Sequence, residues 1–121
     1  MPDSLQPATS AVVQSPPLAQ VSGWALRRAL IAGARKVQRS REHLNRINVF
    51  PVADGDTGTN LAFTMEALID GMRPLRASGS GAVLEVAAQV TLDGARGNSG
   101  AIVAQFFHGL AQACRDQVQL S

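Results

Sequence analysis

Hydrophobic positions recur at helical spacing from Ser22 onward. Six apolar residues before Asn48 follow one another at intervals of seven, three, three, seven and three, which places them on one face of a helix. They are Trp24, Ile31, Ala34, Val37, Leu44 and Ile47. Most arginines of this stretch lie outside that face; they are Arg27, Arg28, Arg35, Arg39 and Arg41. His43 is also expected on the surface of this helix. The pattern predicts one long helix over residues 22–47 with a basic, solvated face.

Three further helices are expected beyond Pro51. The second begins between Thr57 and Asn60, and Gly71 and Pro74 mark its end. Its apolar face is formed by Leu61, Met65, Leu68 and Met72. A flexible connector over residues 76–81 leads to a third helix over residues 82–92, with Val83, Val86, Ala87 and Val90 on its inner face. The fourth helix is expected over residues 101–115, and it is apolar on more than one face through Ile102, Val103, Phe106, Phe107 and Leu110. No strand pattern appears, so the sequence predicts an all-α fold of antiparallel, up-and-down helices.

The first 21 residues differ from the rest of the chain. They are rich in proline, serine, glutamine and alanine, and four prolines among them exclude a long helix. Little in the segment can offset the entropy of ordering it. We therefore expect a flexible extension over residues 1–21, followed by a helical domain over residues 22–121.

Composition and charge exclude several classes of protein. The net charge of +2 is small, and no aromatic residues interleave with the basic ones, which argues against nucleic-acid binding. The single cysteine, Cys114, rules out an internal disulfide and a cysteine-based zinc site, and it is expected to be buried or half-buried. No apolar run approaches the roughly 20 residues that span a bilayer, and no secretory signal is evident. We expect a cytoplasmic protein without a membrane span.

An acidic loop directly precedes the second helix. Asp54 and Asp56 lie two positions apart, and Gly55 and Gly58 allow the backbone to turn tightly around them. Carboxylates arranged in this way can converge on Mg²⁺ or Ca²⁺, which prefer oxygen ligands. The N-terminus of the helix adds unpaired N–H groups and a positive dipole end at the same place. The loop is therefore a candidate site for a cation with a polyphosphate.

A second loop, rich in glycine and spanning residues 94–100, precedes the fourth helix. In an up-and-down bundle the two loops lie at the same end, so we expect Asp56 and Ser99 to contribute to one metal–phosphate site. No Walker A lysine follows the glycines, and no strand precedes them as a dinucleotide fingerprint requires. An EF-hand is excluded because its last ligand position falls on Met65. The alternative is that both loops are ordinary capped turns between helices.

The two motifs together resemble a known family. The stretches Asn48-Val-Phe-Pro-Val-Ala-Asp-Gly-Asp-Thr-Gly-Thr-Asn60 and Gly94-Ala-Arg-Gly-Asn-Ser-Gly100 are similar to the nucleotide-binding domain of the dihydroxyacetone-kinase L-subunit (DhaL) type. The residues of both motifs are most similar to those of the branch found at the N-terminus of fatty acid kinases. The resemblance covers residues 22–114. It implies an eight-helix antiparallel barrel that holds ATP at one end through Mg²⁺ ions.

The resemblance also implies roles for individual residues. Asp54 and Asp56 match the metal-binding aspartates, and Asn48 is the nearest counterpart of a further upstream aspartate, at a different spacing. Ala53 stands where this branch usually has proline, which is expected to loosen the loop slightly. The nucleotide-binding positions are Thr57, Gly58, Thr59, Asn60, Arg96, Gly97, Asn98, Ser99 and Gly100. No side chain is an evident general base, so no catalytic residue is assigned.

The expected function is the ATP- and Mg²⁺-binding part of a DhaL-type kinase. The acceptor would be an acyl group held by a separate fatty-acid-binding carrier protein, or alternatively dihydroxyacetone. Four helices are about half of the expected barrel, which predicts an exposed apolar face, self-association or a missing C-terminal half as partner, and no turnover by this chain alone. The alternative is a non-catalytic nucleotide-binding or protein-interaction module.

Overall fold

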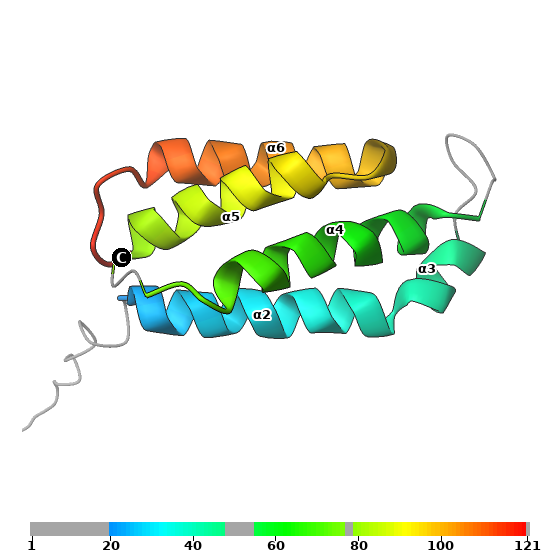
Figure 1. Ribbon diagram of the computed structural model, residues 1–121, viewed down its shortest axis with the longest axis horizontal. Coiled ribbons are helices and arrows are strands. Elements are labelled where there is room, and N and C mark those ends of the chain that lie inside the picture. The colour runs from blue at the N-terminus through cyan, green and yellow to red at the C-terminus, as the bar shows by residue number, and fades with distance from the viewer. Residues whose placement is uncertain (1–19, 48–54, 77–78, 121) are drawn as a thin grey trace, which may run out of the picture.

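The chain forms a bundle of antiparallel helices. The computed structural model describes residues 20–47, 55–76 and 79–120, and five helices lie within these ranges (Figure 1). They are α2 (Gly23–Arg39), α3 (Arg41–Arg46), α4 (Thr57–Met72), α5 (Ser80–Gly94) and α6 (Gly97–Ala113). The long helices α2, α4, α5 and α6 alternate in direction along the chain. The predicted all-α, up-and-down fold is confirmed; the extension expected over residues 1–21 lies almost wholly outside the described residues.

The long helix expected over residues 22–47 is interrupted at Ser40, so that prediction was wrong. The Ser40 N–H donates to the carbonyls of both Lys36 and Val37 at 3.1 Å, and its hydroxyl donates to Lys36 O at 3.0 Å. A serine hydroxyl bonded to the preceding turn competes with the helical pattern and bends the chain. α3 therefore starts in a new direction. Two members of the expected apolar face are exposed, Trp24 at the start of α2 by 50% and Ile47 after α3 by 57%.

The hydrophobic core is built around α4. This helix contacts each of the other four described helices, whereas α3 packs mainly on α4. Leu68, Ile69 and Met72 of α4 are at most 2% exposed and pack against equally buried residues of α5. The core on the α5, α6 and α2 side comprises Val83, Leu84, Ala87, Ala88, Phe107, Ala111 and Ala34. The predicted inner face of α4 is confirmed for its three buried members, Met65, Leu68 and Met72.

Helices α5 and α6 begin earlier than the sequence pattern predicts. The N–H groups of Ser80 and Gly81 donate to the carbonyls of Val118 and Gln117 at 2.8 and 2.7 Å, so the C-terminal segment extends α5 backward. Only residues 95–96 connect α5 to α6. The expected glycine-rich loop over residues 94–100 is therefore mostly the first turn of α6, which changes how its N–H groups are presented.

The basic residues of α2 are solvated, with one exception. Arg28, Arg35 and Arg39 are exposed, as predicted. Arg27 instead donates from Nε to Met72 O at 2.7 Å and from Nη2 to Arg73 O at 2.8 Å. It thereby supplies donors to the last carbonyls of α4, where a cation is also favoured by the helix dipole.

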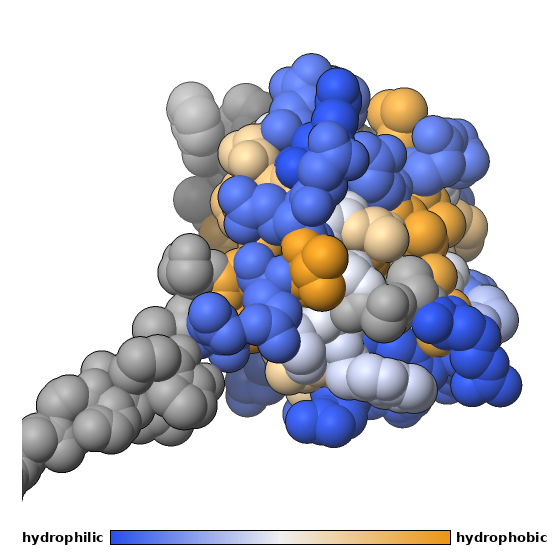
Figure 2. Space-filling model, turned by 90° about the vertical axis from the view of Figure 1, so that its left-hand side faces the viewer, coloured by the Kyte–Doolittle hydropathy of each residue, from blue (hydrophilic) through white to orange (hydrophobic). Residues whose placement is uncertain are grey.

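The ends of the described chain meet at one end of the bundle. Val21 and Leu120 form an isolated antiparallel bridge with hydrogen bonds of 2.7 and 3.0 Å, and the Ser80 hydroxyl donates to Val21 O. Figure 2 shows this end, where hydrophilic residues surround smaller hydrophobic areas. None of the helices in the described ranges is long and apolar enough to cross a membrane.

Candidate functional site

The described parts of the two sequence motifs, residues 55–60 and 94–100, meet at the opposite end of the bundle. The first turn of α4 and the first turn of α6 lie so close that a Cβ atom on Gly97 would overlap the Asn60 amide group, 2.8 Å from its Cγ. Both turns occupy the same end in Figure 1, next to α3. The expectation that both motifs share one end of the bundle is confirmed.

Thr64 joins the two turns. Its hydroxyl donates to Asn60 O at 2.9 Å and accepts the Arg96 N–H at 3.2 Å, although Arg96 lies 32 residues further along the chain. The side chain is fully buried, and a Cβ atom on Gly100 would overlap its Oγ1. One hydroxyl thus fixes the distance between α4 and the start of α6, and Gly100 leaves the space that this contact needs.

Helix α3 holds the N-terminus of α4 from the other side. Asn45 Nδ2 donates to Thr59 Oγ1 at 3.0 Å, and the Thr59 N–H donates to Asn45 Oδ1 at 3.0 Å. Gly58 is buried directly on α3, because a Cβ atom there would overlap the Arg41 carbonyl oxygen. Gly58 and Thr59, both predicted to bind nucleotide, therefore have structural roles in this contact.

The first turn of α6 has the properties of an anion-binding site. Gly97 adopts a φ of +70°, a conformation that suits glycine, and the side chain of the preceding N-cap residue, Arg96, makes no capping hydrogen bond. The N–H groups of Gly97, Asn98 and Ser99 belong to the first turn, where no intrahelical acceptor exists. Ser99 Oγ is buried and has no hydrogen-bond partner among the described residues. A buried, unpartnered hydroxyl costs free energy unless a ligand supplies its partner.

The acidic motif is described only in part. Asp56 is exposed and is the N-cap residue of α4, its carbonyl accepting the Asn60 N–H at 2.9 Å. Gly55 before it has a φ of +71°, as the tight turn requires. Asp54 and Asn48 lie outside the described residues. Within the described ranges no three acidic, histidine or cysteine side chains gather as a metal site, so the metal-ligand set stays a prediction.

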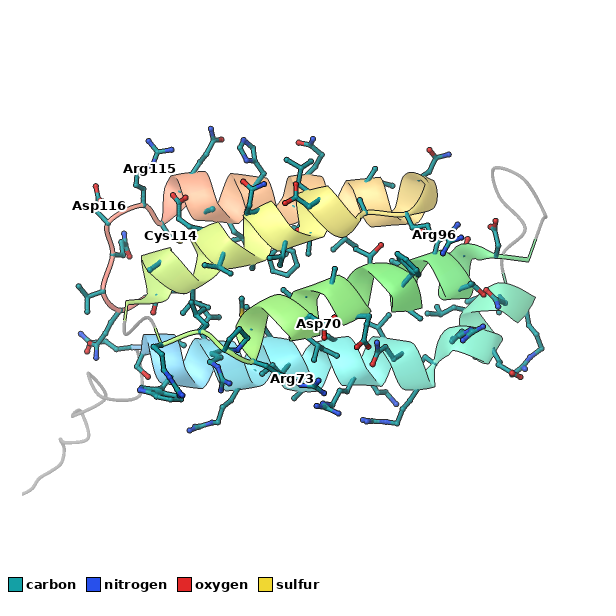
Figure 3. The ribbon with its side chains drawn as sticks, viewed as in Figure 1. Asp70, Arg73, Arg96, Cys114, Arg115 and Asp116 are labelled. Carbon is teal, nitrogen blue, oxygen red and sulfur yellow. The ribbon has the colours of Figure 1, made fainter. Side chains whose placement is uncertain are left out.

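Arg96 lies beside this end of the bundle but packs on an aromatic ring. Its guanidinium carbon is 4.4 Å from the centre of the Phe63 ring, a cation–π geometry. Figure 3 shows Arg96 at the site end of the bundle, apart from Asp70 and Arg73 in the later part of the α4 segment. The side chain is exposed, so its expected phosphate contact stays a prediction.

Sequence reasoning missed Asn45 and Thr64. One signal for Thr64 was available, since Asp56, Asn60 and Thr64 follow one another at intervals of four and therefore share one face of α4. A row of polar residues beside the apolar face of a helix indicates a second contact surface on that helix. No comparable signal marks Asn45, whose role depends on the bend at Ser40.

Comparisons with known proteins show the family of the chain. The sequence profile of the DAK2 domain matches residues 51–121, more than half of the chain. The chain belongs to the DAK2 domain family. This is the DhaL-type family that the two motifs resemble, and its members bind nucleotides in general.

Individual DAK2 relatives are much longer than this chain. Protein YloV of Bacillus subtilis is 36% identical over 83 residues, which are 69% of this chain and 15% of YloV. A protein of Staphylococcus epidermidis and the protein SAUSA300_1119 of Staphylococcus aureus are each 29% identical over 104 residues, 86% of this chain and 19% of theirs. The chain therefore spans less than a fifth of the length of these curated relatives.

Proposed function

We propose that the joined first turns of α4 and α6 bind the phosphates of ATP together with Mg²⁺, as part of a phosphoryl-transfer domain. The observation that carries the proposal is the buried Ser99 hydroxyl, which has no hydrogen-bond partner among the described residues and lies at a helix N-terminus that contacts the acidic motif's helix. Helix N-termini favour anions through their free N–H groups and dipole. DAK2 membership makes a nucleotide the best candidate for that anion.

The donor set fits a magnesium nucleotide. The first turn of α6 offers backbone N–H groups and a hydroxyl, which are donors for phosphate oxygens. The turn before α4 offers Asp56 and, in sequence, Asp54, which are hard oxygen ligands. Bound Mg²⁺ would offset the negative charge that develops on the phosphates during transfer.

The chain's own residues would position the phosphates rather than react with them. The Gly97–Ser99 N–H groups would orient phosphate oxygens, and the lack of a Cβ atom on Gly97 would let the backbone approach them closely. Thr64 and Asn45 would keep α6, α4 and α3 in register, so that donors and carboxylates keep their relative positions. Phosphoryl transfer depends mainly on such positioning and on charge stabilisation.

The acceptor of the phosphoryl group and the cellular location are proposed from the motifs. We propose an acyl group presented by a separate fatty-acid-binding carrier protein, in the cytoplasm, with dihydroxyacetone as the second candidate. No general base is assigned within the chain, and a fatty-acid carboxylate, already ionised near neutral pH, needs none.

Ser99→Ala tests the proposal because it acts in opposite directions on stability and binding. Without nucleotide, removal of the unpartnered hydroxyl should leave the free energy of unfolding unchanged or raise it by up to about 1 kcal/mol. With Mg²⁺ present, ATP affinity should fall about three- to tenfold because a hydrogen bond to phosphate is lost. Thermal unfolding and calorimetric titration, each with and without Mg²⁺, measure both effects.

Ser22→Ala is the matched control. Ser22 caps α2 by accepting the Ala25 N–H at 3.1 Å, so its loss should destabilise the fold by about 1 kcal/mol without a direct effect on ATP. Unchanged ATP affinity in Ser99→Ala would refute the role of this hydroxyl. No ATP binding by the wild-type chain, with Mg²⁺ present, would refute the proposed function.

An interaction module is the second candidate, and exposed apolar side chains favour it. Leu92 of α5 and Ile102 and Phe106 of α6 are 58%, 69% and 63% exposed. Phe107 was expected on the partly covered surface of α6 together with Phe106, but it is buried. We expect the chain to self-associate at micromolar concentrations and Ile102→Glu to shift it toward the monomer. Sedimentation velocity measures this; a concentration-independent monomer in the wild type would contradict it.

A further inference from the structure

Helices α2 and α3 concentrate the basic charge of the chain. Residues 22–47 carry seven arginine and lysine side chains and one acidic side chain, whereas the rest of the chain carries four basic and eight acidic ones. The net charge of +2 therefore divides into +6 on residues 22–47 and −4 on the rest. A charge separated in this way directs one side of the molecule toward anions.

Part of this charge lies in a row on the outer face of α2. Trp24, Arg28, Arg35 and Arg39 follow one another at intervals of four, seven and four, so they share one face of the helix, and all four are exposed. Lys36 lies beside them and is also exposed; Arg28, Arg35, Lys36 and Arg39 are called the basic row below. Figure 3 shows nitrogen-bearing side chains along α2 on the side away from α4. The opposite side of α2 packs on the core through Leu26, Leu30, Ala34 and Val37.

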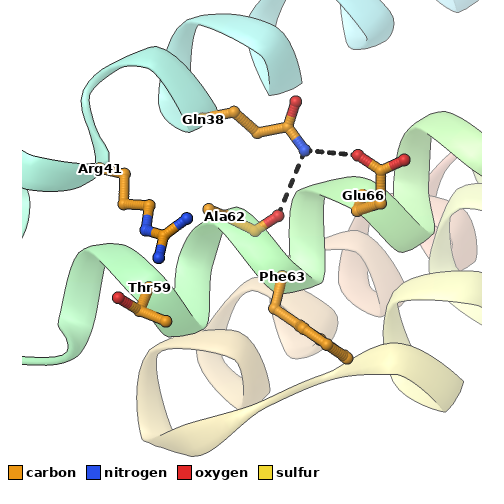
Figure 4. A pocket seen from close by; sticks show the side chains of 6 residues that line it. All are labelled: Gln38, Arg41, Thr59, Ala62, Phe63 and Glu66. Carbon is orange, nitrogen blue, oxygen red and sulfur yellow. Dashed lines mark hydrogen bonds between the residues drawn. The ribbon is translucent and has the colours of Figure 1, made fainter.

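The basic row has no partner within the described part of the chain. None of its four side chains makes a hydrogen bond or an ion pair to another described residue. Glu66, an acidic side chain of α4 that contacts α2, instead accepts a hydrogen bond from Gln38 Nε2 at 2.8 Å (Figure 4). Arg41 lies apart from the row, on α3 near Thr59 of α4 (Figure 4). Four unpaired cations within about 16 Å of one helix repel one another, so an anionic partner is favoured.

Trp24 lies at the N-terminal end of the basic row and is held there. The Arg27 guanidinium carbon is 5.5 Å from the centre of the Trp24 ring, a cation–π geometry. Arg27 is itself fixed by its hydrogen bonds to the carbonyls of Met72 and Arg73. The Trp24 side chain still remains 50% exposed. The row thus ends in a large, oriented side chain of the type that is enriched at membrane–water interfaces.

The residues of this face favour a lipid surface over a protein partner. The core of a protein–protein interface is usually depleted of charged residues. Here Ala32, a small exposed residue, lies between Arg28 and Lys36 at four-residue intervals, so the middle of the face offers charge and little apolar area. An anionic lipid surface requires no complementary shape, because it attracts clusters of arginine and lysine through its negative potential.

We propose that the basic row of α2 docks the chain on an anionic phospholipid surface, with Trp24 at the level of the headgroups. The apolar side of α2 stays packed on the core, so the helix lies along the surface and does not enter the hydrocarbon region. Binding is therefore peripheral, reversible and sensitive to salt. The inference does not depend on the proposed phosphate site, which lies at the N-termini of α4 and α6.

The test is a titration of the 121-residue chain with phosphatidylcholine vesicles that contain about one third phosphatidylglycerol. Trp24 is the only tryptophan of the chain, so its fluorescence reports on this face. We expect the emission to shift to shorter wavelength and acrylamide quenching to decrease as vesicles are added. Vesicles of phosphatidylcholine alone should produce neither change, and about 0.5 M salt should reverse both. Equal binding to the two kinds of vesicle would overturn the proposal.

Substitutions separate the basic row from net charge. Arg35→Gln should weaken binding to the anionic vesicles about fivefold, and Arg28→Gln combined with Arg35→Gln about twentyfold. Both positions are exposed and without a described partner, so circular dichroism should show an unchanged fold. Arg115→Gln is the matched control, since Arg115 is an exposed arginine at the end of α6, on the other side of the bundle from α2 (Figure 3). It should change binding less than about twofold. Equal losses in Arg35→Gln and Arg115→Gln would show attraction by net charge only and would overturn the docking face.

Two further outcomes would overturn the lipid assignment. Vesicle binding that leaves the Trp24 emission unchanged would place another face of the chain on the lipid. Polyglutamate or a single-stranded RNA oligonucleotide that binds more tightly than the anionic vesicles at equal salt, and loses affinity in Arg35→Gln, would assign the basic row to a protein or a nucleic acid. All these titrations omit ATP and Mg²⁺, so their failure would leave the proposed function intact.

Discussion

Asp56→Asn is expected to weaken ATP binding in the presence of Mg²⁺ on the order of 100-fold, equivalent to about 2.7 kcal/mol. Asparagine keeps the size of the side chain and is an equally good N-cap residue, so α4 should start as it does in the wild type. The substitution removes the charge that a hard cation prefers in its ligand. Without Mg²⁺ the variant should bind ATP no more weakly than the wild type, since a carboxylate near phosphates is then repulsive.

Asp54→Asn should show the same Mg²⁺-dependent loss if both aspartates hold the cation. Asp70→Asn is the matched control, since Asp70 is an exposed aspartate near the end of the same helix, apart from Arg96 (Figure 3). Calorimetric titration with ATP, with Mg²⁺ and with EDTA, measures the effect, and circular dichroism checks the fold. Equal Mg²⁺-dependent affinities for the Asp56→Asn and Asp70→Asn variants would refute metal binding at the acidic motif.

The second large effect is expected for Gly58→Ala, which should lower the free energy of unfolding by about 2–3 kcal/mol. The added methyl group would overlap the Arg41 carbonyl oxygen and lie 2.9 Å from both Arg41 C and Asn45 Oδ1. Because the obstruction includes main-chain atoms of α3, a change of rotamer cannot relieve it. Either α3 moves away from α4, which breaks the two hydrogen bonds of Asn45 with Thr59, or α4 starts in a new position.

Gly33→Ala supplies the control for Gly58→Ala. Gly33 lies inside α2, and no neighbouring atom lies within 4 Å of the position that an alanine methyl group would take. Alanine should therefore stabilise the chain by about 0.5–1 kcal/mol through helix propensity alone. Urea unfolding followed at 222 nm should move the midpoints of the two variants in opposite directions. A Gly58→Ala variant as stable as the wild type would show that the contact between α3 and α4 is not rigid.

The sequence anticipated the helices because their signals are local. The apolar residues of α4 recur at four- and three-residue intervals, and Asp56 and Gly71 stand near its ends, so its start was predicted closely. The DAK2 motifs could also be recognised in the sequence, because a tight turn around carboxylates requires glycine at fixed positions. Gly55, with a φ of +71°, agrees with that interpretation, whereas Gly58 lies inside α4 without a positive φ, so the prediction that it takes part in the turn was wrong.

The arrangement of the site depended on contacts between distant residues. Thr64 accepts a hydrogen bond from the Arg96 N–H, 32 positions further along the chain. Asn45 donates a hydrogen bond to Thr59, 14 positions further along, and it can do so only after the bend at Ser40, which the hydrophobic periodicity did not predict.

The sequence by itself determined an all-α chain, the start of α4 and the two motifs that identify the DAK2 family, because spacing along the chain encodes helix faces and tight turns. Only the tertiary structure decided that Gly97–Gly100 form the first turn of α6 and that Ser99 Oγ is buried without a described partner. It also decided that Gly58 must lack a side chain. These properties arise when helices pack, since burial and close approach depend on neighbours that are remote in sequence.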